Sequence, residues 1–445
     1  THAPDEKEYA DRKLRDEESA RALAAHSVLT DASLDELYAR STKLSAVGVE
    51  RFVAELCAVS AAELSTGDPS SGTQYFLDEE DLRPGGKYDD LQPLPPLGDP
   101  RRPRVAALQR LVDVADMNVH LRPRLAWDRM WRVLAAHFAR AGAHANADVA
   151  TYAVDSLRQL SLKFLAKEEL KAFTFQRAFL KPFERAFRAN QGSIERAPVR
   201  AYIVACLDVL VQARASKIRS GWKSILGVLK DASGDSDRAV SQAAFEALGR
   251  VLDHHMALVA PDFVSVVGTA AAFASYSVAD EARSATALEA LARLDACARA
   301  LADGSIRAAT RAASASRDGD LPEGPENEPP PDDAQLELWW PLLLGLARLV
   351  ADPREKVRNA ALATLRRVLE RDGLKEFGAE TWRLVFRGVL FPCLESAWTD
   401  DAPRPASVRP TDPPPGPPPP SEASWLDTTA PAVLDCIVGL YARLG

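Results

Sequence analysis

The segment 148–165, DVATYAVDSLRQLSLKFL, contains polar side chains that could bind another protein. Its apolar residues recur every three or four positions, which predicts a helix with one buried stripe. Asp155, Arg158 and Gln159 lie off that stripe. The Arg158 guanidinium could pair with a partner's carboxylate in a bidentate geometry, and Asp155 could orient it at the i,i+3 spacing. The same three residues could equally lock neighbouring helices together, so both interpretations stay open.

A second segment, KIRSGWKSIL at 217–226, places Arg219, Trp222 and Lys223 around one glycine. Exposed Trp and Arg side chains dominate many binding interfaces, at about 2 kcal/mol or more each. A tryptophan in such a helical segment more often fills the space between helices. The stretch 172–187, AFTFQRAFLKPFERAF, contains five phenylalanines interleaved with charges. Here we favour packing between helices over an aromatic docking surface.

The sequence contains no recognisable catalytic or metal-binding motif. Phosphate-loop, dinucleotide-binding, nucleophile-elbow and zinc-protease patterns are all absent. His254 and His255 are adjacent, so on a helix they point to different sides and are poorly placed to share a metal ion. Glu168 and Glu169 are typical of a solvated helix start. We therefore predict no catalytic residue, no metal and no cofactor, and that the chain is not an enzyme.

Composition and charge narrow the class of protein further. The chain has 445 residues, of which 47% are apolar, and a formal net charge of −8. Dedicated nucleic-acid binders are usually basic, so we predict no nucleic-acid partner. The five cysteines are far apart and form no C-x-x-C pair, which indicates the reducing cytoplasm rather than a zinc or disulfide framework. No run of eighteen apolar residues occurs, so the sequence predicts no membrane-spanning helix. Because the sequence stops inside an apparent helix, we expect it to be a fragment of a longer protein.

Four segments share one pattern, in which a valine in fourth place is followed by small residues and a final leucine. They are NADVATYAVDSL (146–157), RAPVRAYIVACL (196–207), DRAVSQAAFEAL (237–248) and REKVRNAALATL (354–365). The valines of these segments are separated by roughly forty residues or by a multiple of that number, and a period near forty is typical of HEAT or armadillo repeats. A weaker copy, DEARSATALEAL, lies at 280–291. The predicted fold is an all-α solenoid of stacked helix pairs, in which each stripe packs on neighbouring pairs.

The predicted organisation has five parts separated by changes in composition. They are N-terminal helices at 1–64, a linker at 65–104, a helical-repeat core at 105–317, a Pro-rich acidic linker at 318–335 and C-terminal repeats at 336–445, which a Pro-rich stretch interrupts at 402–423. Proline removes a backbone donor and favours extended chain, so these stretches cannot pack as helices.

Several long motifs resemble one known family, the BIG family of large, brefeldin-A-inhibited Arf guanine-nucleotide exchange factors. The resemblance lies in YARSTKLSAVGVERFVAELCAVSAAELS, LAWDRMWRVLAAHF, NADVATYAVDSLRQLSLKFLAKEELKAFTFQRAFLKPFE and KIRSGWKSILGVL. It extends from about Leu34 to Val264, with weaker likeness in WWPLLLGLARLVADPREKVRNAAL and WRLVFRGVLFPCLE. The similar region of that family lies downstream of its catalytic Sec-seven domain.

The resemblance implies a regulatory and targeting scaffold of an Arf exchange factor that acts in Golgi vesicle trafficking. We find no counterpart of the family's catalytic F-R-x-P-G-E loop, so exchange chemistry would belong to another domain. The implied partners are small GTPases of the Arf family and its relatives, other domains of the same exchange factor, the Golgi or trans-Golgi membrane contacted peripherally, and a second copy in a homodimer. The candidate surface comprises Asp155, Arg158, Gln159, Arg219, Trp222 and Lys223. The alternative is a generic HEAT-repeat adaptor or trafficking scaffold with no exchange role.

Overall fold

The structure is a computed structural model in which every regular element is helical. It describes residues 31–65, 105–166, 169, 175–275, 283–315, 331–395, 425 and 427–444. Within these ranges the chain forms α-, 3-10 and π-helices and no strand, which confirms the predicted all-α class. Two compact units comprise Thr1–Ala141 and Gly142–Gly445. The sequence did not predict a division at 141, and the predicted linkers at 65–104, 318–335 and 402–423 lie largely or wholly outside the described residues. The prediction that 318–335 is not helical is wrong at its end, because a helix begins at Pro331, where a proline needs no backbone donor.

The first unit is a small helical cluster built around helix α3. Its elements are α2 (Asp31–Ala39), η1 (Arg40–Lys43), α3 (Ala46–Ser65), α4 (Ala106–Val119) and α5 (Arg124–Ala141). Helix α3 packs against both α4 and α5. Buried Asn118 of α4 donates to the Ser41 hydroxyl at 2.9 Å, and Arg122 donates to the carbonyls of Ser41 and Leu44. These bonds hold the turn before α3 in place.

A buried histidine makes the stability of this first unit depend on pH. His137 of α5 is 1% exposed, and its Nε2 lies 2.9 Å from the Ser60 hydroxyl of α3. Burial, with a smaller contribution from Arg140, lowers its pKa to about 4. An unfolded imidazole titrates near 6.5, so the unfolded chain takes up the proton first as pH falls. The contribution of neutral His137 to folding stability is therefore complete above about pH 6.5. As the pH falls from about 6.5 to 4, the free energy of unfolding decreases by about 3 kcal/mol.

Hydrogen exchange of the α3 and α5 amides, corrected for intrinsic rates, would measure this loss. The His137→Gln variant keeps a hydrogen-bonding group toward Ser60 but cannot titrate. We expect its protection to stay flat over the same pH window. An equal loss of protection in the wild type and the variant would contradict the assignment to His137.

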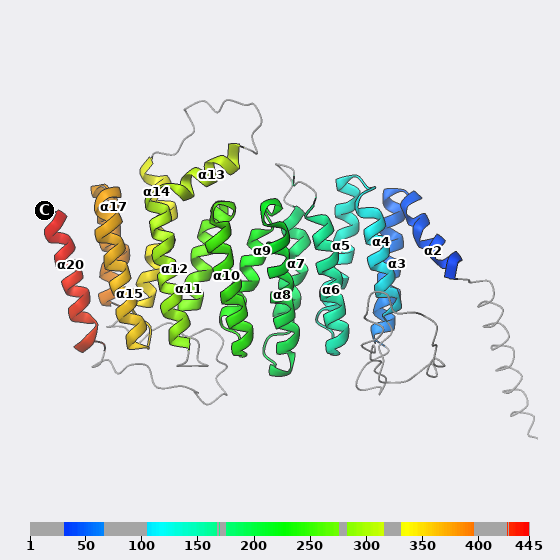
Figure 1. Ribbon diagram of the computed structural model, residues 1–445, viewed down its shortest axis with the longest axis horizontal. Coiled ribbons are helices and arrows are strands. Elements are labelled where there is room, and N and C mark those ends of the chain that lie inside the picture. The colour runs from blue at the N-terminus through cyan, green and yellow to red at the C-terminus, as the bar shows by residue number, and fades with distance from the viewer. Residues whose placement is uncertain are drawn as a thin grey trace, which may run out of the picture. The chain divides into compact units, whose positions relative to one another are not determined.

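The second unit is a stack of helix pairs in two layers (Figure 1). One layer contains α6 (Ala147–Phe164), α8 (Ala197–Arg214), α10 (Arg238–Val259), α12 (Ser284–Ala302), α15 (Glu355–Val368) and α20 (Ala430–Leu444). The other contains α7 (Phe175–Ala189), α9 (Trp222–Ser233), α11 (Phe263–Ala274), α14 (Pro331–Leu349), α17 (Ala379–Val385), η8 (Phe386–Leu390) and α18 (Phe391–Glu395). Successive helices of a layer contact each other, and each layer contacts the other. This arrangement confirms the predicted solenoid of stacked helix pairs.

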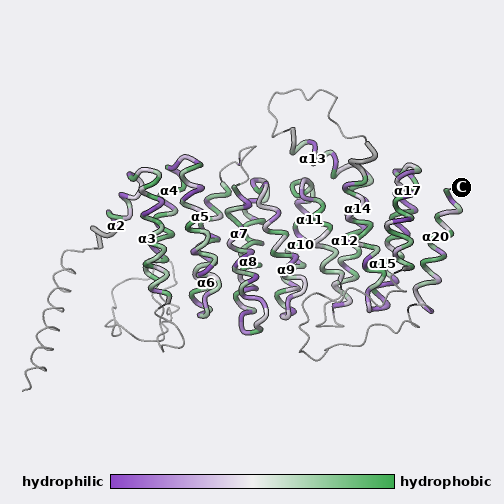
Figure 2. Tube along the Cα trace, turned by 180° about the vertical axis from the view of Figure 1, so that it is seen from behind, coloured by the Kyte–Doolittle hydropathy of each residue, from purple (hydrophilic) through white to green (hydrophobic). Residues whose placement is uncertain are grey.

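The repeat pattern marks the start of helices in the first of these layers. The four pattern valines, Val149, Val199, Val240 and Val357, are each the third residue of their helix and are at most 1% exposed. Asn146 and Asp237 cap α6 and α10, each accepting from two backbone amides of the first turn. Such caps satisfy amides that have no partner within the helix. Small residues after each valine allow close packing, and hydrophilic and hydrophobic stretches alternate along the helices (Figure 2).

The phenylalanines of 172–187 fill the space between helices. Phe175, Phe179, Phe183 and Phe187 are at most 9% exposed on α7. The Phe179 ring stacks on that of Phe164 from α6 with centroids 4.0 Å apart, and Phe175 meets the same ring edge-on. The packing interpretation is confirmed for these four rings, whereas Phe173 lies outside the described residues.

Arginine side chains connect the loops of the second unit through hydrogen bonds and an ion pair. Arg200 and Asp235 form an ion pair with both side chains 1% exposed, at 2.6 Å. Arg196 donates to the carbonyls of His144 and Ala145, and Arg283 donates to those of Ser233 and Asp235. Further along, buried Arg358 of α15 donates to two loop carbonyls and to a threonine hydroxyl. Each arginine therefore replaces lost backbone hydrogen bonds at a turn between helices.

One helical stretch, Arg238–Ala274, is long and apolar enough to cross a membrane by length and composition. It comprises α10 and α11, which are joined by η4 (Ala260–Asp262). Both helices pack within the stack, α10 against α8 and α9, and α11 against α9 and α12. Of the most apolar 18-residue part of this stretch, 44% is buried inside the structure.

Candidate functional site

The polar residues predicted on α6 form one connected cluster with a tyrosine from α8. Asp155 accepts hydrogen bonds from Arg158 Nε at 2.8 Å, from Gln159 Nε2 at 2.7 Å and from the Tyr202 hydroxyl at 2.8 Å. The predicted i,i+3 contact between Asp155 and Arg158 is thus present. Each of these two side chains is 28% exposed. The cluster joins two repeats and also presents an oriented guanidinium to solvent.

The electrostatics of this cluster favour its charged form. Burial opposes ionisation of Asp155, but the hydrogen bonds from Gln159, Arg158 and Tyr202 outweigh it and hold the pKa of that carboxyl below its usual value. Burial and the bond to Asp155 raise the pKa of Tyr202, which keeps the phenol protonated as a donor. The group is therefore a fixed ion pair that can exchange hydrogen bonds with a partner, and it contains no nucleophile or proton-transfer set.

Similar polar contacts continue along the same layer. Arg250 of α10 pairs with Asp208 of α8 at 2.9 and 3.0 Å. Arg293 of α12 pairs with Asp253 of α10 at 2.9 Å. Reasoning from the sequence missed Tyr202 and these pairs. Arg250 and Arg293 occupy matching positions in successive repeats. An arginine that recurs at the same position of each repeat is the sequence signal that could have predicted these pairs.

The segment 217–223 forms the connection into α9, and most of it is structural. Glu169 accepts from the Ser220 amide and hydroxyl, and Gln176 accepts from the Arg219 amide at 2.7 Å. A Cβ on Gly221 would lie 3.0 Å from Leu180 and 3.4 Å from the Gln176 oxygen, so this backbone sits close against α7. The motif therefore anchors α9 to α7.

The side chains of the predicted residues in this segment divide into two kinds. Trp222 is 1% exposed and lies in the core. Lys223 is 52% exposed, with its Nζ 3.7 Å from Asp262, and Arg219 is half-buried. Helix α9 belongs to the layer opposite α6, so the structure does not bring this segment together with the Asp155 cluster. The partner-binding role of the six residues stays a prediction.

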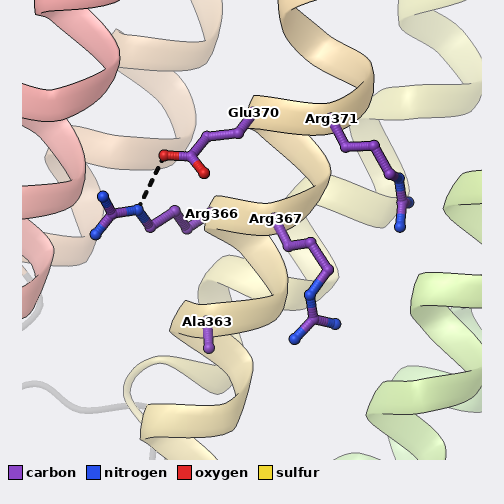
Figure 3. Close-up of a pocket in the computed structure, with 5 residues that line it drawn as sticks. All are labelled: Ala363, Arg366, Arg367, Glu370 and Arg371. Carbon is purple, nitrogen blue, oxygen red and sulfur yellow. Dashed lines mark hydrogen bonds and ion pairs between the residues drawn. The ribbon is translucent and has the colours of Figure 1, made fainter.

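A shallow hollow lies on α15 and on η7 (Leu369–Gly373), lined by Ala363, Arg366, Arg367, Glu370 and Arg371. Figure 3 shows Arg366 and Glu370 pointing to one side, and Arg367 and Arg371 to the other. Arg366 pairs with Glu370 at 3.0 Å and with Asp435 of α20 at 2.7 Å. Arg371 pairs with Asp372 and Asp295. Because acidic side chains already pair with these arginines, the hollow offers no site of net positive charge for an anion.

Reactive or metal-binding groups do not gather in the described part of the chain. No three His, Cys, Asp or Glu residues there are placed to hold a metal ion. All five cysteines are free and buried. Burial raises the pKa of Cys57, Cys206, Cys297 and Cys393 to about 12 and that of Cys436 to about 11. Their thiols are thus protonated near neutral pH.

Comparison with known proteins places this arrangement in a family context. Residues 163–250 match the family model described as "Mon2/Sec7/BIG1-like, HDS", and residues 339–413 match "GBF1-like, tetratrico peptide repeat region". The chain is 30% identical over 415 residues to brefeldin A-inhibited guanine nucleotide-exchange protein 1 of Arabidopsis thaliana. This alignment covers 92% of this chain and 22% of that protein. No solved structure matches it.

The animal proteins of the same name give a similar result. The chain is 30% identical over 378 residues to brefeldin A-inhibited guanine nucleotide-exchange protein 1 of Bos taurus and of Homo sapiens, covering 83% of this chain and 18% of each protein. The chain thus spans about a fifth of the length of the relatives it matches. The Arg219–Lys223 segment lies inside the HDS match, and the Asp155 cluster lies mostly before it. These matches confirm the predicted resemblance: over 92% of its length the chain is similar to one region of the brefeldin A-inhibited guanine nucleotide-exchange proteins, and residues 163–250 match an HDS segment.

Proposed function

We propose that the chain is a regulatory and targeting region of an Arf guanine-nucleotide exchange factor, downstream of its catalytic domain and active in Golgi vesicle trafficking. The observation that carries this proposal is the match to brefeldin A-inhibited guanine nucleotide-exchange proteins over 92% of the chain. The stacked helix pairs support a binding role, because solenoids offer long continuous surfaces. On this proposal the region acts in the cytoplasm, peripherally on Golgi or trans-Golgi membranes, and can self-associate.

The surface that fits this role best is the Asp155 cluster on the α6–α8 layer. Arg158 is held in one orientation by Asp155, and its planar guanidinium can bind a carboxylate with two hydrogen bonds. Gln159 and Tyr202 extend the polar surface on either side. The proposed partner is a GTP-loaded small GTPase of the Arf family or a relative, and an acidic surface on a neighbouring domain of the same exchange factor would use the same chemistry.

Reversing the charge of Arg158 tests this assignment. We expect Arg158→Glu to weaken binding of GTP-loaded Arf-family GTPases at least about tenfold, because a carboxylate would then face a carboxylate. Its effect on stability should stay near 1 kcal/mol, the usual size for a partly exposed ion pair. The measurement is titration by calorimetry, with the melting temperature recorded in parallel.

Arg348→Glu is the matched control, because Arg348 is exposed on α14 in the opposite layer. It makes the same charge change away from the cluster and should leave GTPase binding unaltered. A collapse of the melting temperature in Arg158→Glu would instead assign the cluster to locking α6 against α8. Unchanged binding in a folded Arg158→Glu variant would remove the cluster from the proposed surface.

A further inference from the structure

Five cations occupy the outer side of α7 and α9, two neighbouring helices of one layer. Arg177, Lys181 and Arg185 follow at i, i+4 and i+8 on α7, and Lys223 and Lys230 lie on α9; all five are exposed. We call these residues the α7–α9 basic strip. Such a concentration is notable in a chain whose net charge is −8.

The acidic residues near the strip do not neutralise it. Asp231 accepts from Arg188 Nε at 2.6 Å, and Glu184 lies 3.8 Å from the same guanidinium, so both are directed to Arg188. Lys223 is the one strip residue with an ion pair, a 3.7 Å contact with Asp262. Within the described residues, the other four strip cations form none. The strip therefore keeps an excess of positive charge.

The strip also lacks the anchors that protein interfaces use. No large hydrophobic side chain is exposed on α7 or α9 in the described structure, and small residues such as Ala178 and Gly227 lie between the cations. Protein interfaces generally depend on buried aromatic or aliphatic anchors at their centre. An anionic membrane surface requires only charge, and clusters of four to eight Lys or Arg residues suit it.

We propose that the α7–α9 basic strip binds the anionic headgroups of a phospholipid membrane. The inference rests on the proposed function only in placing the chain at a membrane, since the charge distribution itself is independent of any GTPase. It adds a surface and a ligand chemistry to that function. The Asp155 cluster lies in the opposite layer, so lipid contact through the strip leaves the cluster free for a protein partner.

Sedimentation of the whole chain with vesicles tests the proposal. The probes are phosphatidylcholine vesicles with and without about 30% phosphatidylserine, at low and at physiological salt. We expect binding only to the anionic vesicles, weakened by salt because the contacts are screened. The variant Arg177→Glu, Lys181→Glu, Arg185→Glu should lose at least about a hundredfold in partitioning, since each cation contributes about fivefold near such a surface and the new carboxylates are repelled by it.

A matched control separates the strip from total charge. Arg238→Glu, Arg348→Glu, Lys356→Glu makes the same charge change at three exposed positions on different helices. It should retain most of the vesicle binding, and Arg158→Glu should retain all of it. Equal loss in the two triple variants, no binding by the wild type, or binding to poly-glutamate but not to anionic vesicles would overturn the proposal. Because no GTPase is present, these outcomes are independent of the Arg158 experiment.

Discussion

Asp235→Ala is expected to destabilise the second unit by about 3–5 kcal/mol, because it leaves the buried guanidinium of Arg200 without its counter-charge. In the wild type Asp235 accepts two hydrogen bonds from Arg200, at 2.6 and 2.8 Å, and both side chains are 1% exposed. Arg200 also donates to the carbonyls of Asn190 and Ser193. Removing the carboxylate keeps the guanidinium buried with only these neutral acceptors.

The effect should be local, since each repeat of a solenoid contacts mainly its neighbours. Native-state hydrogen exchange measures it best, because a long stack need not unfold in one step. We expect protection to fall in α8, α9 and α10 and to change little in α14 and α15. A uniform loss along the whole unit would contradict a local role for this pair.

Asp208→Ala is the control, because Asp208 and Arg250 join the same two helices, α8 and α10, at a more exposed place. There the arginine side chain is 40% exposed and the aspartate 16%. A pair of this kind contributes about 0–1 kcal/mol. The double variant Arg200→Met, Asp235→Leu should recover much of the loss, since apolar residues can replace a buried ion pair. Equal effects of Asp235→Ala and Asp208→Ala would show that burial does not set the cost.

The repeats were predictable because their signal is local. The pattern of a valine at the third position of a helix, followed by small residues and a leucine, spans only about twelve residues of one helix, and helix periodicity alone reveals it. The contact of Asp155 with Arg158 was predictable for the same reason, as residues at i,i+3 are neighbours on any helix. The family resemblance added the identity of the region, which periodicity cannot supply.

The contacts between repeats could not be predicted from the sequence. The Tyr202 bond to Asp155 and the Arg200–Asp235 pair join residues 47 and 35 positions apart. Whether such residues meet depends on the register between neighbouring helix pairs, and this register follows from the packing of the whole stack. The same holds at Arg283, which replaces the valine in the weak repeat copy and donates to loop carbonyls instead.

The burial of Trp222 favours the core-packing role over the partner-binding role, both of which the sequence left open. The indole is 1% exposed at the start of α9, next to Gly221, whose backbone is held against α7. We therefore expect Trp222→Ala to destabilise the repeat by about 3–5 kcal/mol through the cavity it leaves. Lys223→Ala, one residue further and 52% exposed, should change stability by less than about 0.5 kcal/mol.

The decisive measurement compares binding with folding in the same variants. Thermal melting and hydrogen exchange in α7 and α9 report the cavity, and GTPase titration at a temperature where Trp222→Ala remains folded reports any direct contact. If the indole only fills the core, the folded variant binds like the wild type, and Trp222→Phe recovers part of the stability because it refills part of the cavity. Loss of binding by a fully folded Trp222→Ala protein would mean that α9 shifts on binding and brings the indole to the surface.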